Sequence, residues 1–158
     1  MMKILTVFYS RTGTTKGIGE YIANELKCDI EEIYDTQKRS GIIGFLRSGY
    51  QATRAKLTVL KPISKNPIDF DLIIIGTPIW NRHVSTPIRT YLFENGSKFK
   101  DIAFFCTEGS KGGVRAFTEM EKICNKTPKV RLEITRKEIK KGLHNTKLKD
   151  FIVDIQKT

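Results

Sequence analysis

The sequence predicts an α/β fold: a doubly wound, three-layer domain in which helices cover both faces of a five-stranded parallel sheet. Residues 3–9, 71–76 and 102–106 are continuous apolar runs without polar alternation, which is typical of strands buried on both faces. Segments with helical spacing of apolar residues separate the strands. Such alternation of strand and helix favours right-handed crossovers within one open sheet.

Two weaker strand patterns complete the sheet. Residues 29–34 are only moderately apolar and residues 130–135 alternate cleanly, as expected of strands nearer the edges. Helices are predicted where apolar residues share one helical face, at residues 18–26, 86–93, 114–124 and 143–155. No repeat or linker-like stretch interrupts the 158 residues, so we expect a single domain over residues 1–158.

Composition excludes several classes of protein. Hydrophobic residues make up 39% and charged residues 28% of the chain, which fits a soluble globular protein rather than a disordered one. The chain lacks an apolar run of membrane-spanning length and a cleavable leader, so we expect a cytoplasmic protein without stable membrane insertion. Cys28, Cys106 and Cys124 form no CxxC pair and are expected to be reduced core thiols.

The net charge of +11 is unevenly distributed along the chain. Residues 38–65 contain seven Lys or Arg and no acidic residue, and residues 129–149 contain eight against two acidic residues. Such patches attract acidic proteins, nucleic acid or anionic lipid, and a solvated basic surface is the plainer interpretation. Nucleic acid is not expected, because aromatic residues are not interleaved through the basic stretches.

The loop after the first strand has the composition of a phosphate-binding site. Residues 9–16 read YSRTGTTK and lead into the first helix, whose unpaired N–H groups and dipole favour an anion. Gly13 allows close approach of the backbone, and the neighbouring hydroxyls are further donors. The nucleotide motifs GxxxxGK[ST] and GxGxxG are absent. A simple helix cap is the alternative.

Two further loops are expected at the same edge of the sheet. Residues 76–83 (GTPIWNRH) follow the third strand and residues 106–113 (CTEGSKGG) follow the fourth. Because the carboxyl ends of parallel strands share one edge, the three loops should converge on one crevice.

In order and sequence these loops resemble those of the flavodoxin family, and the resemblance covers essentially the whole chain. It rests on [ST]-x-T-G-x-T at residues 10–15, G-T-P-x-W at residues 76–80 and the third Gly-rich loop. The resemblance implies strand order 2-1-3-4-5 and flavin mononucleotide (FMN) as cofactor. The cofactor-binding residues that it implies are Ser10, Arg11, Thr12, Gly13, Thr14, Thr15, Thr77, Pro78, Ile79, Trp80, Asn81, Thr107, Glu108, Gly109, Ser110, Gly112 and Gly113.

The resemblance also implies roles within this set. Residues 10–15 would bind the FMN phosphate, and residues 107–113 would close the pyrimidine edge of the ring. Trp80 would stack on the ring, unless it is an ordinary core aromatic. Asn81 tolerates the positive φ that family members need at a peptide which flips beside the ring, unless it is merely a turn former.

The sequence departs from the family pattern in two respects. The third loop has no aromatic residue, so one ring face would be open or covered by another segment. The chain is basic where most flavodoxins are acidic. With Arg82, Lys111 and His83 expected near the ring, we expect a less negative hydroquinone potential than in an acidic relative. As lone histidines, His83 and His144 are otherwise expected on the surface.

Residues 39–57 are expected to contain the second crossover helix. Ile42, Ile43, Leu46 and Tyr50 share one helical face among basic residues, and this face is expected to pack on the sheet. The alternative is a basic amphipathic element that docks on a partner or a membrane surface.

Taken together, these features predict an FMN-binding electron-transfer protein that shuttles one or two electrons between cytoplasmic redox partners. Acidic proteins such as a ferredoxin-type donor or a reductase are the expected partners. The alternative is an FMN-dependent oxidoreductase acting on a quinone or other small substrate. A regulatory or nucleic-acid-binding domain without cofactor would explain the charge but not the three loops. Neither a catalytic triad nor a metal-ligand cluster is apparent in the sequence.

Overall fold

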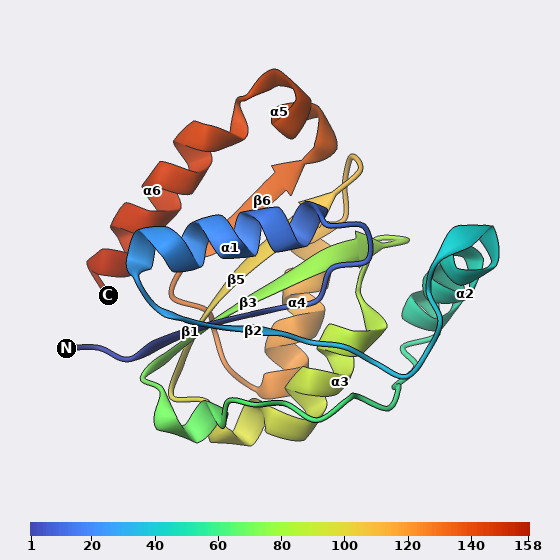
Figure 1. Ribbon diagram of the computed structural model, residues 1–158, viewed down its shortest axis with the longest axis horizontal. Helices are drawn as coiled ribbons and strands as arrows, with labels where there is room; N and C mark the ends of the chain where they lie inside the picture. The colour runs from blue at the N-terminus through green and yellow to red at the C-terminus, as the bar shows by residue number, and fades with distance from the viewer.

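The computed structural model describes all 158 residues as a central parallel sheet between two layers of helices (Figure 1). The sheet consists of β1 (Ile4–Phe8), β2 (Asp29–Glu32), β3 (Leu72–Trp80), β5 (Asp101–Glu108) and β6 (Arg131–Thr135). Their order is β2-β1-β3-β5-β6, and every pair is parallel. The short β4 (His83–Val84) pairs antiparallel with β3 and lies off this path. The predicted 2-1-3-4-5 order of the main strands is therefore confirmed.

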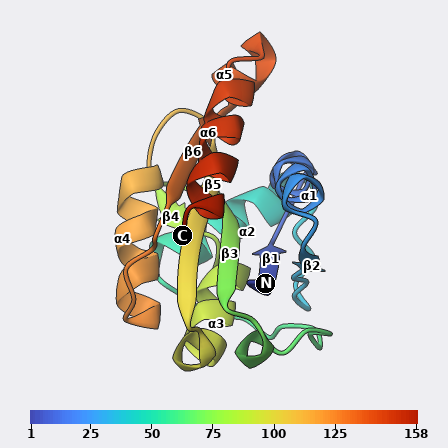
Figure 2. The ribbon, with the colours of Figure 1, turned by 90° about the vertical axis from the view of Figure 1, so that its left-hand side faces the viewer.

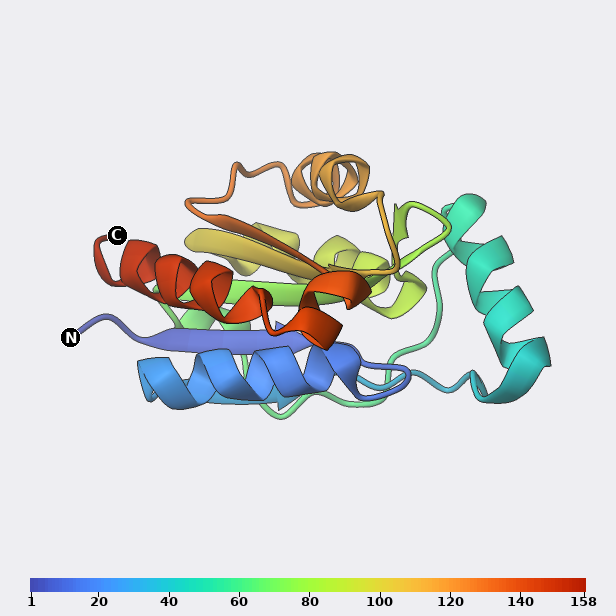
Figure 3. The same cartoon turned by 90° about the horizontal axis from the view of Figure 1, so that it is seen from above.

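Each face of the sheet is covered by its own pair of helices (Figures 2 and 3). On one face α1 (Thr14–Leu26) and α6 (His144–Gln156) enclose a core of 13 buried residues. On the other, α3 (Thr86–Asn95) and α4 (Gly113–Cys124) enclose a core of 21. Short helices α5 (Arg136–Lys141), η1 (Pro67–Asp69) and η2 (Gly96–Lys98) lie in the connections.

The central strand β3 shows why the sequence lacks alternation there. Leu72 and Ile74 point into the core under α1 and α6, whereas Ile73 and Ile75 point into the core under α3 and α4. All four side chains are fully buried. A strand with apolar cores on both faces has no solvated side, so every position is apolar.

Helix α2 (Gly41–Thr53) stands apart from the two helical layers, at the end of the sheet where the first loop lies (Figures 1 and 3). Its buried side is formed by the small residues Gly44, Ser48 and Ala52. Ile42 is 79% and Ile43 74% exposed, and the other large apolar residues of the helix are also exposed. The prediction that its apolar face packs on the sheet is therefore wrong. The physical reason is the close approach of the helix to the backbone of Arg39, which only a small side chain permits.

A buried ion pair fixes α2 to the rest of the molecule. The Nε and Nη2 atoms of Arg39 donate to Oδ2 of Asp35 at 2.9 and 2.6 Å, and Nη1 donates to Oγ of Ser48 at 3.1 Å. Both charged side chains are only 3% exposed. The hydroxyl of Thr58 donates to the same carboxylate oxygen at 3.0 Å. The guanidinium carbon lies 5.0 Å from the ring centroid of Trp80, so Arg39 joins α2 to β3.

The close packing of α2 predicts opposite effects for two glycine substitutions in this helix. Gly44→Ala should lower the free energy of unfolding by about 1–3 kcal/mol, because overpacking forces the helix to shift. Its added methyl would lie 2.2 Å from the carbonyl carbon of Arg39. Gly49→Ala meets nothing within 4 Å and should raise stability by about 1 kcal/mol through helix propensity. Urea unfolding followed by fluorescence of the single tryptophan, Trp80, measures both. Equal effects would contradict this packing.

Removing one partner of the buried ion pair should be costly. Arg39→Met should lower the free energy of unfolding by about 3–5 kcal/mol, because Asp35 would remain buried without its counter-charge. Adding Asp35→Asn should recover part of the loss. Lys100→Met is the matched control, since its pair with Asp71 is exposed on both sides, and it should leave stability nearly unchanged. Urea unfolding of the wild type, Arg39→Met, the double variant and Lys100→Met measures these differences. An Arg39→Met effect as small as that of Lys100→Met would refute the anchoring role of Arg39.

Candidate functional site

A cavity of about 600 Å³ lies at the carboxyl ends of the central strands, between the first loop, the β3–β4 hairpin, the end of β5 and α2. This volume lies within the usual range of small-molecule and cofactor sites. It brings together all three predicted loops. The predicted binding residues that border it are Arg11, Thr12, Thr14, Thr15, Pro78, Ile79, Trp80, Asn81, Thr107, Glu108 and Gly109.

The first loop presents free backbone donors at the start of α1. Gly13 is the N-cap with φ 96°, and no side chain caps the helix. The first N–H groups of an uncapped helix lack intrahelical partners and favour an anion. Thr12 and Thr14 border the cavity with exposed side chains. The residues present therefore fit a phosphate group.

Two hydroxyl groups of this loop hold its shape. The Ser10 hydroxyl accepts a hydrogen bond from the Gly13 amide at 3.1 Å. The hydroxyls of Thr15 and Thr107 lie 2.7 Å apart in a buried contact, which ties the first loop to β5. Ser10 and Gly13 do not border the main cavity, so direct binding of the cofactor by these two residues stays a prediction.

The second predicted loop is mostly strand. β3 continues through Trp80 and turns back into β4, with pairs Ile79–Val84 and Trp80–His83. The two turn residues, Asn81 and Arg82, have φ values of 49° and 67°. Positive φ at both positions is characteristic of the type I′ turn that matches strand twist. Asn81 thus has the expected positive φ, as one of the two residues of a tight turn. The predicted role of Asn81 beside a flavin ring stays a prediction.

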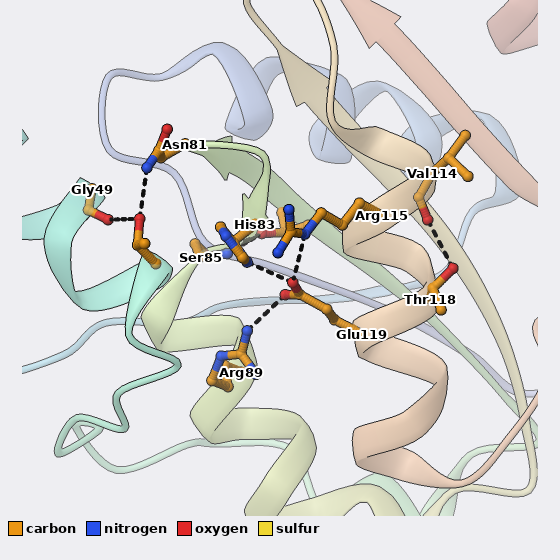
Figure 4. A network of polar contacts seen from close by, with 11 residues as sticks. Gly49, Asn81, His83, Ser85, Arg89, Val114, Arg115, Thr118 and Glu119 are labelled. Atoms are coloured by element: carbon orange, nitrogen blue, oxygen red, sulfur yellow. Dashed lines mark hydrogen bonds and ion pairs between the residues drawn. The ribbon is translucent and has the colours of Figure 1, made fainter.

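The hairpin is held by side-chain contacts on both sides (Figure 4). The Asn81 amide donates to the Thr53 hydroxyl at 2.6 Å, at the end of α2. On the other side Nδ1 of His83 lies 2.5 Å from Oε1 of Glu119 on α4. The second oxygen of Glu119 accepts from Arg89 on α3 at 2.7 Å.

His83 is therefore not the surface residue that was predicted. It is only 9% exposed, because the hairpin turns β4 back against α4, and it does not border the cavity. His144, the other histidine expected on the surface, is half-buried at the start of α6.

Trp80 borders the cavity but is largely enclosed by protein. Its side chain is 9% exposed, with the ring of Tyr9 edge-on at 5.5 Å and Arg39 at 5.0 Å from its centroid. Burial raises the pKa of Tyr9 to about 12, so the phenol remains neutral at physiological pH. This environment is that of a partly buried core aromatic, and stacking of Trp80 on a ring stays a prediction.

The third loop contributes fewer cavity residues than predicted. β5 continues through Glu108, whose Oε2 accepts a hydrogen bond from the amide of Gly113, the first residue of α4. Burial raises the pKa of Glu108, and the nearby Glu133 carboxylate raises it further. Gly112, at φ 125°, packs against the backbone of Arg82.

Four further predicted residues lie outside the cavity wall. They are Thr77, Ser110, Gly112 and Gly113. The Thr77 hydroxyl lies 2.9 Å from that of Ser85 and steadies the base of the hairpin. The cofactor role of these four residues stays a prediction.

The sequence interpretation missed one whole wall of the site. Residues 45, 46 and 48–50 of α2 border the cavity, including Phe45 and Tyr50, as does Arg136 at the start of α5. Phe45 and Tyr50 thus add aromatic residues to the cavity wall, whereas the third loop contributes none. The apolar helical face within a basic stretch was the signal that could have identified them.

Of the cations expected near the site, only Arg11 borders the cavity. Arg11 and Arg136 border it, whereas Arg82 and Lys111 do not. Arg11 also supports the α2 wall: its Nε donates to the Arg39 carbonyl at 2.8 Å, and its guanidinium lies 5.4 Å from the ring centroid of Phe45. The positive charge near the site therefore comes from the first loop and α5.

Comparison with known proteins identifies the fold. No model of a known protein family matches the sequence, and no curated protein matches it either. A flavoprotein in complex with FMN from Lactobacillus acidophilus NCFM superposes with a TM-score of 0.73 at 22% identity, covering 89% of this chain and 98% of that one.

Two flavodoxins also superpose over nearly the whole chain. Oxidised flavodoxin 2 from Bacillus cereus has a TM-score of 0.60 at 15% identity and covers 98% of each chain. A flavodoxin from the domain Archaea has a TM-score of 0.58 at 19% identity, covering 98% of this chain and 96% of that one. At these identities the likeness is one of architecture, and the chain has the α/β fold of flavodoxins and related flavoproteins.

Proposed function

We propose that the protein binds FMN in the 600 Å³ cavity and carries electrons between redox partners. The observation that carries this proposal is the meeting of an uncapped helix N-terminus with a cavity walled by aromatic residues. One end suits a phosphate and the other a planar ring. The fold is shared with a flavoprotein whose structure contains FMN.

The chain's own residues would position the two ends of the cofactor. The first amides of α1 and the hydroxyls of Thr12 and Thr14 would bind the phosphate. Phe45 and Tyr50 on α2 would flank the ring, opposite the hairpin wall that includes Pro78. When bound, the flavin supplies the redox chemistry, while the protein binds it, orients it and limits its access to water.

The charges around the cavity affect the reduction potential that a bound flavin would have. Arg11 and Arg136 place positive charge at its border, which favours added electrons on a bound flavin. The carboxyl of Glu108 also borders the cavity, and burial raises its pKa. The two arginines support the expected less negative reduction potential. Acidic redox proteins remain the proposed partners on the basis of the net charge of +11.

A second candidate function is favoured by the apolar α2 wall. Phe45, Leu46 and Tyr50 border the cavity and are more than half exposed. Such a wall would also accommodate a planar quinone beside the flavin, as an FMN-dependent oxidoreductase requires.

FMN binding should depend on charge at the first loop. Purified protein mixed with FMN should show a perturbed flavin spectrum and quenched flavin fluorescence. Thr12→Glu should weaken FMN binding by at least about tenfold, because a carboxylate would oppose the phosphate at the helix N-terminus. Riboflavin, which lacks the phosphate, should bind both proteins within about twofold of each other.

Thr118→Glu is the matched control for this experiment. Thr118 is an exposed residue of α4 outside the cavity, so the added charge should leave FMN affinity nearly unchanged. If wild-type protein binds neither flavin after reconstitution, the proposed function is wrong. Equal weakening of FMN and riboflavin by Thr12→Glu would place the phosphate elsewhere.

Turnover separates the two candidate functions. A carrier should reduce quinone with a nicotinamide donor no faster than an equal concentration of free FMN, because it lacks a site for hydride transfer from that donor. Oxygen-free stopped-flow absorbance at the nicotinamide band measures this rate. Saturable turnover well above that of free FMN would select the oxidoreductase.

A further inference from the structure

The outward face of α2 is an apolar patch that the fold itself leaves uncovered. Five of the exposed large apolar side chains lie in this one helix: Ile42, Ile43, Phe45, Leu46 and Tyr50. Isolated apolar residues on a surface need no explanation, but a contiguous group on one element usually marks an interaction site.

A cofactor in the cavity would not cover the whole patch. Phe45, Leu46 and Tyr50 border the cavity, whereas Ile42 and Ile43, the two most exposed of the five, do not. These two isoleucines begin the helix and remain open to solvent whatever the cavity holds. They therefore need an occupant of their own.

The chain segment that contains α2 carries only basic charged residues. Residues 36–68 contain seven Lys or Arg and no Asp or Glu. Arg39 is buried in its pair with Asp35, and Lys65 pairs with Asp29. The other five cations are exposed and form no ion pair: Lys38, Arg47, Arg54, Lys56 and Lys61. The charge on this side of the molecule complements an anionic surface.

We propose that α2 docks the protein peripherally on an anionic membrane surface. The helix projects from the body beyond the end of the sheet (Figure 3), so it offers a protruding apolar edge rather than a groove for a peptide. Aliphatic and aromatic side chains flanked by Arg and Lys are the composition of helices that lie in the lipid headgroup region. None of the helices has the length and apolar character that crossing a bilayer requires.

The outward orientation is enforced by buried contacts. Gly44, Ser48 and Ala52 are held inward, with Ser48 bonded to Arg39 and Gly44 against the Arg39 backbone. Rotating α2 to bury its isoleucines would break the hydrogen bond between Ser48 and Arg39 and would move Gly44 away from the Arg39 backbone. The apolar edge is thus a fixed feature of the folded protein.

Sedimentation with lipid vesicles tests the proposal on the full chain, with and without added FMN. Wild-type protein should bind vesicles of phosphatidylcholine mixed with phosphatidylglycerol, and bind pure phosphatidylcholine much more weakly. Ile42→Glu combined with Ile43→Glu should lower the partition coefficient for mixed vesicles by at least about tenfold. Phe93→Glu is the control, because Phe93 is a similarly exposed apolar residue on α3, and it should have little effect.

The local charge is tested by a second pair of variants. Arg47→Gln with Arg54→Gln should weaken binding about 25-fold at low salt, since each surface cation near anionic lipid contributes about fivefold. Lys137→Gln with Lys140→Gln removes the same net charge from exposed residues of α5 and should weaken it much less. Absence of binding to mixed vesicles, or binding unchanged by the α2 variants, would overturn the proposal and leave an acidic protein as the partner of this face.

Discussion

The buried pair of Arg39 and Asp35 is the interaction on which the site depends. Two charges that are 3% exposed are expensive to desolvate, and here the carboxylate oxygen accepts three hydrogen bonds while the guanidinium also reaches Ser48. This set of contacts can form only if α2 presents its small residues inward. The cavity wall, the enclosure of Trp80 and the outward apolar edge all follow from that orientation.

The sheet supplies the complementary rigid half of the cavity. β3 is buried between both cores and continues beyond its parallel neighbours into the β4 hairpin. The hairpin is then tied to α2 through Asn81 and to α4 through His83. A ligand at this edge would therefore meet backbone that is fixed from two sides, which reduces the ordering cost of binding.

Charge has two separate roles in this molecule. Around the cavity it is local: the α1 amides, Arg11 and Arg136 face a site that also contains the largely buried Glu108. Along residues 36–68, which include α2, the charged residues are all Lys or Arg. The two proposals share Phe45 and Tyr50, but the membrane proposal is tested at Ile42 and Ile43, which do not border the cavity, so either can fail without the other.

The sequence by itself determined the fold class, the succession of strands and helices along the chain, and the meeting of three loops at one edge of the sheet. These follow from local signals, namely the double-sided apolar runs of β1, β3 and β5 and the hydroxyl-rich turn before α1. It did not determine the orientation of α2, because an amphipathic pattern states which face is apolar but not whether the fold covers it. Only tertiary structure decided that, through the contact of Gly44 with the Arg39 backbone and the buried Arg39–Asp35 pair. The inward position of His83 and the wall formed by Phe45 and Tyr50 were decided likewise, since contacts between distant segments have no periodicity that a sequence can display.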